Sequence, residues 1–267
     1  MTVLISLGCA VATATVVMAV TALVAHRQVR VVVVDVAWGL GFVAIGAVCA
    51  AVAAIAGAGD ALRTTILVTL VAVWGLRLSG HIAARSRGDR EEDPRYLKVL
   101  GGSLDEVGIG VAIRKVFAVQ GVAMAVIAAP MAVGAALDVD WWPVVVIGAV
   151  LWLVGLFFEA VGDAQLAAYR RRPRDERPPV LDTGLWRYTR HPNYFGDACV
   201  WWGVWLIGGA ASGWVPAAAT LVAPVAMSWF LIAVTGVRMT EEKMLQRPAY
   251  RAYADRTSMF VPLPPRR

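Results

Sequence analysis

The chain has 267 residues, of which 59% are hydrophobic and 16% are charged, and its mean hydropathy is +0.65. Apolar runs of about 20 residues match the ~30 Å hydrocarbon core of a bilayer, so this composition indicates a polytopic membrane protein and not a soluble domain. The net charge of +6 comes from basic residues spread over the segments between these runs, which argues against a nucleic-acid-binding surface.

Seven apolar runs, each bounded by charged residues, glycine or proline, are long enough to be transmembrane helices. In chain order they cover residues 3–25, 31–56, 62–83, 111–136, 142–161, 195–211 and 215–237. The sequence therefore predicts an all-α membrane bundle of about seven helices in a single integral domain, residues 1–267. The first run has no basic segment before it, so we expect a retained helix and not a cleaved signal peptide.

The distribution of lysine and arginine predicts the orientation of these helices. Basic residues follow the first, third, fifth and seventh runs, whereas the other connections hold Arg63 and the acidic Asp138 and Asp140. Because cytoplasmic loops are enriched in lysine and arginine, we expect the N-terminus outside and the C-terminus in the cytoplasm. The segments 85–110 and 165–194, and the tail from residue 238, would then be open to a soluble anionic cofactor.

The cysteines do not indicate a metal site. Cys9, Cys49 and Cys199 lie within or at the edges of apolar runs and lack the spacing of metal ligands, so we interpret them as packing residues and expect no metal.

Polar residues also occur inside the predicted N-terminal helices. Asp35 and Trp38, three residues apart, share one helix face, and Asp35 could simply pair with Arg27 or Arg30 at the helix end. Arg77 and His81 share a face of the third helix. An arginine so far inside an apolar run needs a partner or water, or must extend its side chain to the membrane edge.

Segment 184–197, which leads into the sixth predicted helix, places many ionisable and hydrogen-bonding side chains close to apolar runs. Arg187, Arg190 and Asn193 are donors suited to phosphate, and Tyr188 and Tyr194 are aromatic residues that can give a proton. Near the end of the fifth helix, Glu159 and Asp163 are four residues apart, so their carboxylates point the same way. Taken alone, the Glu159–Asp163 pair and the arginines that follow it would be interpreted as a solvated helix end.

Several motifs in chain order resemble the DUF1295 family, grouped with the steroid 5-alpha-reductases and sterol reductases. They lie at residues 35–42 (DVAWGLGF), 74–80 (WGLRLSG), 157–165 (FFEAVGDAQ), 184–197 (GLWRYTRHPNYFGD) and 248–253 (PAYRAY). The resemblance implies a membrane oxidoreductase that takes hydride from NADPH and reduces an activated carbon–carbon double bond of a lipophilic substrate from the cytoplasmic side. It implies a substrate side in residues 1–110 and a cofactor side in residues 111–267.

The resemblance also implies residue roles. The cofactor-binding residues would be Asp163, Arg170, Arg190, His191, Asn193, Tyr194, Asp197 and Arg238, to which Arg187 is added as a phosphate donor. The group that polarises the substrate or protonates it would be one of Tyr188, Tyr194, Glu159 and His81. Asp35, Trp38 and Arg77 would contact the substrate. The chain departs from the steroid enzymes in having Glu159 where they have asparagine, and in lacking their Gln-Glu pair in the second helix, which puts a 3-oxo-steroid substrate in doubt.

Two other functions stay open. Arg190-His191-Pro192-Asn193-Tyr194, followed by Glu241-Glu242, also looks like the isoprenylcysteine and phospholipid methyltransferases, which bind S-adenosylmethionine with such residues. A non-enzymatic lipid-binding protein is the third possibility. We expect an integral protein of a bacterial plasma membrane, with membrane lipids and a lipophilic small molecule as partners, no nucleic acid and no obligatory protein partner.

Overall fold

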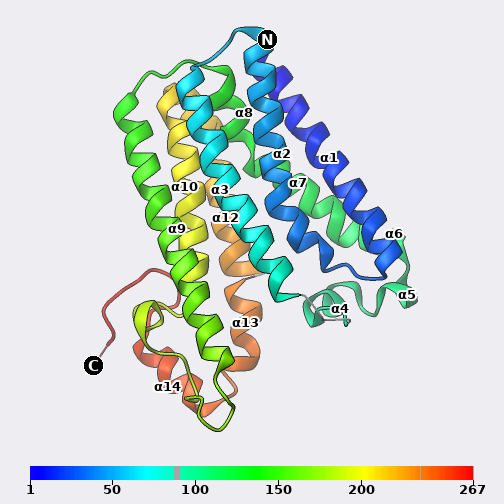
Figure 1. The fold of residues 1–267 in the computed structure, drawn as a ribbon, viewed down its shortest axis with the longest axis vertical. Coiled ribbons are helices and arrows are strands. Elements are labelled where there is room, and N and C mark those ends of the chain that lie inside the picture. The colour runs from blue at the N-terminus through cyan, green and yellow to red at the C-terminus, as the bar shows by residue number, and fades with distance from the viewer. Residues whose placement is uncertain (87–90, 235, 267) are drawn as a thin grey trace. The chain divides into compact units, whose positions relative to one another are not determined.

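A computed structural model of the chain describes residues 1–86, 91–234 and 236–266 (Figure 1). Within these ranges the secondary structure is helical, apart from an isolated bridge between Thr189 and Ser258, so the predicted all-α class is confirmed. The chain divides into two compact units. Unit 1 comprises residues 1–145 and 205–223, and unit 2 comprises residues 146–204 and 224–267.

Among the described residues, six helical segments are long and apolar enough to cross a membrane. They are α1 (Thr2–Gln28), α2 (Val33–Ala56), α3 (Ala61–Arg85), the segment Ile109–Ala136, α9 (Trp142–Arg171) and the segment Trp214–Val234. The sixth predicted helix, residues 195–211, corresponds to α10 (Pro192–Gly208), which has 17 residues and is shorter than these six. The protein is thus a helical membrane protein.

The fourth and sixth segments in this set are interrupted helices. Ile109–Ala136 contains α6 (Ile109–Ala112), the π-helix η1 (Ile113–Phe117), α7 (Ala118–Ile127) and α8 (Ala129–Ala136). Trp214–Val234 contains α11 (Trp214–Thr220), α12 (Val222–Trp229) and the π-helix η4 (Phe230–Val234).

Unit 1 is built on α1, α2 and α3, which lie side by side, with α7 and α8 packed against α1 and α2 (Figure 1). The tightest crossing is between Gly39 of α2 and Gly75 of α3. A Cβ on Gly39 would lie 2.5 Å from the Gly75 carbonyl oxygen, and one on Gly75 would lie 2.6 Å from the Gly39 oxygen. Only glycine permits this backbone contact, which is a usual way for membrane helices to approach closely.

The segment after α3 is fastened to the start of α2 by acidic side chains. Asp35 accepts hydrogen bonds from Arg95 Nη2 at 2.8 Å and from the Tyr96 hydroxyl, both on α4 (Pro94–Leu100). The Glu92 carboxylate accepts from the backbone N–H groups of Val31 and Val32. Asp35 thus pairs with Arg95, whose guanidinium α4 brings to it from 60 positions away in the chain.

Arg63, the basic residue that breaks the predicted charge pattern, lies in the first turn of α3 and is fully buried. Its guanidinium donates to Ser212 Oγ at 2.6 Å and to the carbonyl oxygens of Gly134 and Leu137 at the end of α8. Those carbonyls have no intrahelical donor at a helix C-terminus, and a cation there also complements the helix dipole. Arg63 thus serves packing inside unit 1, which explains why it does not follow the loop charges.

In unit 2, α9 and α10 pack antiparallel through glycines. Gly203 lies against the Gly148 carbonyl, Gly196 against that of Gly155, and Gly162 against the Pro192 ring. The three glycines of α9 are seven residues apart and share one face. This packing sets the start of α10 beside the last third of α9.

The C-terminal tail forms two short helices, α13 (Val237–Met244) and α14 (Pro248–Arg256). Tyr250 and Tyr253 share a face of α14, as their spacing predicts, but both are buried. The tail of unit 2 is therefore folded against its own unit through this face.

Candidate functional site

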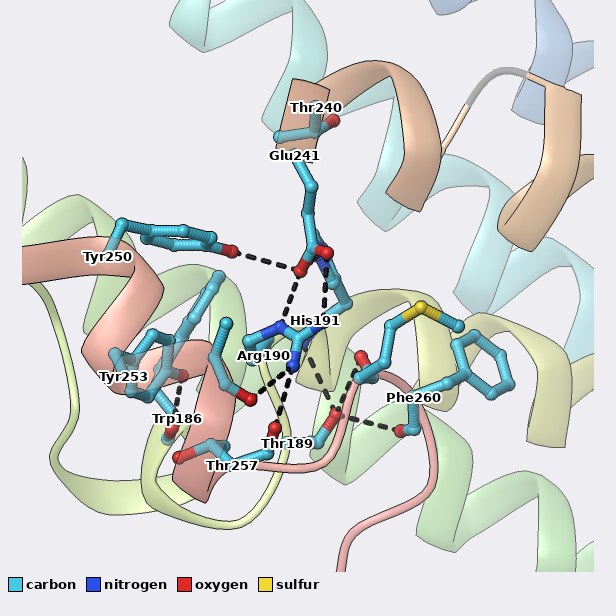
Figure 2. A network of polar contacts seen from close by, with 12 residues as sticks. Trp186, Thr189, Arg190, His191, Thr240, Glu241, Tyr250, Tyr253, Thr257 and Phe260 are labelled. Carbon is cyan, nitrogen blue, oxygen red and sulfur yellow. Dashed lines mark hydrogen bonds and ion pairs between the residues drawn. The ribbon is translucent and has the colours of Figure 1, made fainter. Parts of the chain in front are cut away.

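The centre of the most connected polar cluster in unit 2 is the carboxylate of Glu241 on α13 (Figure 2). It accepts hydrogen bonds from Arg190 Nε at 2.6 Å and Nη2 at 2.9 Å, and from the Tyr250 hydroxyl at 3.0 Å. His191 Nε2 lies 3.0 Å from Glu241 Oε1. Only 10% of the Arg190 side chain and 6% of that of Glu241 are exposed, so this ion pair is shielded from water.

The rest of the Arg190 guanidinium is held by backbone carbonyls. Its Nη1 donates to Ala254 at 3.0 Å and to Thr257 at 2.8 Å, at the end of α14. The Arg190 guanidinium thereby links α13 and α14 to the Arg190-His191 pair, which directly precedes α10. Its expected role as a phosphate ligand stays a prediction, and a phosphate would have to replace one of these bonds, so the geometry favours a positioning role.

The charges around Glu241 set its protonation state. Burial by itself would raise the pKa of this carboxyl, but the hydrogen bonds and positive charge of His191 and Arg190 outweigh it and lower the pKa from 4.5 to about 2. Burial and the Glu241 charge raise the pKa of Tyr250, which therefore stays protonated and donates. An ionised carboxylate can only accept, so His191 presents a protonated Nε2 to Glu241.

This depressed pKa predicts an acid-sensitive step in folding stability. The Glu241 carboxyl binds a proton more readily in the unfolded chain, so its contribution is complete above about pH 4.5 and is lost as the pH falls towards 2. A difference of that size corresponds to about 3 kcal/mol. We expect the melting temperature of the detergent-solubilised protein to fall over this range by more than that of Glu241→Gln, and equal slopes for the two proteins would contradict the assignment.

The loop that precedes Arg190 is anchored to α9. The Trp186 indole N–H donates to the Gly162 carbonyl at 3.1 Å, and the backbone N–H of Leu185 donates to Gln165 Oε1 at 3.0 Å. The Tyr253 hydroxyl donates to the Trp186 carbonyl oxygen. Gly184 has φ of +61°, a conformation that suits glycine, and it turns the chain into η2 (Gly184–Arg187).

A second polar group joins the first turn of α10 to α9. Asn193 Nδ2 donates to Asp163 Oδ1 at 3.2 Å. Glu159, one turn before Asp163, is buried, and Asp197, one turn after Asn193, is half-buried. The Tyr194 ring stacks on the His191 ring with centroids 5.5 Å apart. The spacing of four residues in each helix does place these polar side chains on one face, as the sequence predicted.

The remaining predicted residues fall into two sets. In unit 2, Arg170, Arg187, Tyr188 and Arg238 are exposed. In unit 1, Trp38 packs edge-on against Phe42 at 5.1 Å, and Arg77 and His81 are half-buried on α3. Unit 2 thus brings together most predicted cofactor residues, whereas Asp35, Trp38, Arg77 and His81 belong to the other unit.

Some of the most connected residues were not among those predicted for the reductase site. Glu241 belongs to the glutamate pair of the methyltransferase-like pattern, and Tyr250 belongs to the motif at residues 248–253, but neither residue was predicted to bind the cofactor. Gln165 lies in the motif 157–165 but had no predicted role, and Tyr96 lies in no motif, because a polar residue outside the apolar runs needs no special explanation.

Comparison with known proteins gives the family. Residues 21–257 match the sequence profile of a family described as "Protein of unknown function (DUF1295)". An uncharacterized protein of Schizosaccharomyces pombe is 31% identical over 89 residues, which are 30% of this chain and 23% of the yeast protein. No solved structure matches the chain. Because the match covers most of its length, the chain belongs to the DUF1295 family.

Proposed function

We propose that this protein is a membrane reductase that binds NADPH at the arginine-rich end of unit 2 and reduces an activated carbon–carbon double bond of a lipophilic substrate. The proposal includes the orientation in which this end faces the cytoplasm, where lysine and arginine are enriched and NADPH is available. The observation that carries it is the exposed arginine-rich turn at the end of α9, beside an ordered polar network.

The arginine-rich turn, residues 170–177, is folded and not merely charged. Arg177 Nη2 donates to the carbonyl oxygens of Arg170 and Arg172, and the Tyr169 hydroxyl donates to Pro178. The side chains of Arg170, Arg171, Arg172 and Arg174 are exposed around it. A folded turn that carries several exposed guanidinium groups suits a ligand with several phosphate groups, because arginine binds phosphate through paired hydrogen bonds.

Charge also favours NADPH over the cofactor of the alternative function. NADPH carries a pyrophosphate and a ribose phosphate, whereas S-adenosylmethionine carries a sulfonium cation, which such a turn would repel. Arg187 and Arg238 are further exposed cations in the same unit. The Asn193 amide and the carboxylates of Asp163 and Asp197 supply the neutral and acidic partners that ribose hydroxyls need.

When bound, NADPH would supply the hydride that is transferred to one carbon of the double bond. The electron pair of that bond moves onto the conjugated oxygen, and a proton added to the neighbouring carbon completes the reduction. The protein must therefore polarise the oxygen and deliver one proton. Three residues of unit 2 are candidates for polarising the oxygen or delivering the proton. They are Tyr194, whose ring stacks on that of His191, and Tyr188 and Glu159.

In unit 1, His81 remains the proposed candidate, and Tyr96 donates its hydroxyl proton to Asp35. Burial and the negative charge of Asp35 raise the pKa of Tyr96, so that its hydroxyl keeps its proton near neutral pH. Because that single O–H already makes the bond to Asp35, Tyr96 holds the carboxylate in place and does not polarise a substrate oxygen. Trp38 and Arg77 complete the proposed substrate-binding set.

One observation supports the methyltransferase as a second candidate. The Arg190-His191 pair contacts Glu241 directly, and these are the residues through which the chain resembles the isoprenylcysteine methyltransferases. The same contact would also serve the reductase, since it positions the start of α10 under either function.

Ligand stabilisation of the purified protein tests these candidates. A ligand that binds only the folded state at 100 times its Kd adds about 2.7 kcal/mol of stability. We expect NADPH to raise the melting temperature, and Arg170→Ala to weaken binding about tenfold or more, since a charge-assisted hydrogen bond contributes about 1.5–3 kcal/mol. Arg114→Ala, which removes an exposed arginine from unit 1, is the matched control and should leave binding unchanged. Stabilisation by S-adenosylmethionine alone would overturn the reductase in favour of the methyltransferase, and no response to either would leave neither enzyme standing.

A further inference from the structure

The segment after α14, residues 258–266, is an extended strap fixed along its length to the loop before α10. The backbone N–H of Arg190 donates to the Ser258 carbonyl at 2.9 Å, and Thr189 Oγ1 donates to the Phe260 carbonyl at 2.8 Å. The backbone N–H of Leu263 donates to the Tyr188 carbonyl at 3.0 Å. The strap therefore has a defined position in unit 2.

Side chains along the strap alternate between two faces, as expected for an extended chain. Phe260 points inward and packs edge-on against Phe195, with ring centroids 6.1 Å apart. On the other face, Met259, Val261 and Leu263 expose 38%, 53% and 52% of their surfaces. Three neighbouring apolar side chains in water form a row that proteins normally cover or place in a membrane.

The position of Phe260 relates the strap to the membrane depth of α9. An exposed apolar row on α9, which suits contact with lipid, runs from Val146 to Phe157 and ends before the buried Glu159. Phe158, at the end of this row, packs against Phe195 at 5.1 Å, and Phe195 in turn contacts Phe260. The strap thus lies where the hydrocarbon-facing surface of α9 ends, and Figure 1 shows the tail rising from α14 beside α9.

The arginine-rich turn lies much farther along the same helix. Arg170 is twelve residues after Phe158, which is about 18 Å at 1.5 Å per residue. The interfacial layer adds only about 5–8 Å on each side of the hydrocarbon core. The strap is therefore at interface depth, whereas the arginine-rich turn projects into water.

We propose that the strap is a membrane-interface anchor whose Met259, Val261 and Leu263 side chains insert into the boundary between lipid headgroups and acyl chains. Arg266, exposed at its end, suits the anionic headgroup layer. The strap also carries the backbone contacts of Tyr188 and Thr189, so lipid contact holds the loop that leads into the Arg190–Glu241 ion pair. This inference is independent of the proposed function.

Site-directed fluorescence in lipid nanodiscs tests the anchor. Val261→Cys and Leu263→Cys would be made in the full-length protein with Cys9, Cys49 and Cys199 replaced by alanine, and labelled with the fluorophore NBD. Arg172→Cys, on the projecting turn, is the matched control. We expect lipid carrying a shallow nitroxide to quench the strap labels at least twofold more than the control label, and aqueous iodide to show the reverse order.

The other outcomes contradict the proposal. Strap labels that iodide quenches as strongly as the control would mean that the strap faces water. Strap labels that neither quencher reaches would mean that protein, such as a second copy, covers the strap. Unchanged melting temperatures of the labelled variants would show that these results come from the native fold, and the Val261 and Leu263 labels must agree for the anchor to stand.

Discussion

Glu241→Ala is expected to destabilise the protein by about 3–5 kcal/mol, the usual effect of removing one partner of a buried ion pair. The substitution leaves the Arg190 guanidinium charged in a site where only 10% of its side chain is exposed. It also removes the acceptor of the Tyr250 hydroxyl and of His191 Nε2. The melting temperature in detergent should fall on the order of 10 °C, by the usual relation between free energy and melting temperature for a chain of this size.

The neighbouring residue provides the control for this prediction. Glu242 has the same side chain and is exposed, so Glu242→Ala should change stability by about 0.5 kcal/mol or less. Glu241→Gln keeps an acceptor for Tyr250 but not the charge that neutralises Arg190, and its effect should lie between the two. Similar melting temperatures for the two alanine variants would show that the ion pair does not hold α13 to the start of α10.

Arg63→Ala is expected to destabilise unit 1 by about 3 kcal/mol or more, because each buried polar group left without its partner costs about 1–3 kcal/mol. The carbonyl oxygens of Gly134 and Leu137 and the hydroxyl of Ser212 would all lose a donor. The deletion also leaves a cavity at a fully buried position. Thermal melting of the purified variant, or its folded yield from membranes, would measure the loss.

Arg85→Ala, at the exposed end of the same helix, is the appropriate comparison for Arg63. Arg85→Ala removes an arginine side chain that is exposed to water, so the stability of this variant should lie within about 0.5 kcal/mol of that of the parent protein. Arg63→Lys retains the charge and fewer donors, so it should recover part of the stability. If Arg63→Ala melted like Arg85→Ala, water and not the guanidinium would have to satisfy the end of α8.

The apolar runs were enough to predict the helical membrane class and the positions of most helices. Long runs bounded by charge can satisfy their backbone in a bilayer only as helices, so α1, α2 and α3 begin and end within a few residues of the predicted limits. The predicted end of α9 is wrong, because the helix continues to Arg171 although its apolar run ends near residue 161. Helix formation there depends on packing against the loop at Gly162 and Gln165, and apolarity does not report it.

Local spacing likewise predicted which polar side chains share a helix face, such as Glu159 with Asp163, because helix geometry alone decides it. The sequence did not predict which residues from distant parts of the chain contact one another. The contacts of Arg190 with Glu241, of Asp35 with Arg95 and of Arg63 with Ser212 join residues 51 to 149 positions apart. An arginine beside an apolar run looks the same in the sequence whether it faces lipid headgroups, a cofactor or a buried carbonyl. The sequence alone determined the membrane class and the polar inventory of each helix, and only the tertiary structure decided which charges neutralise one another, because ion-pair partners are set by helix packing and not by chain order.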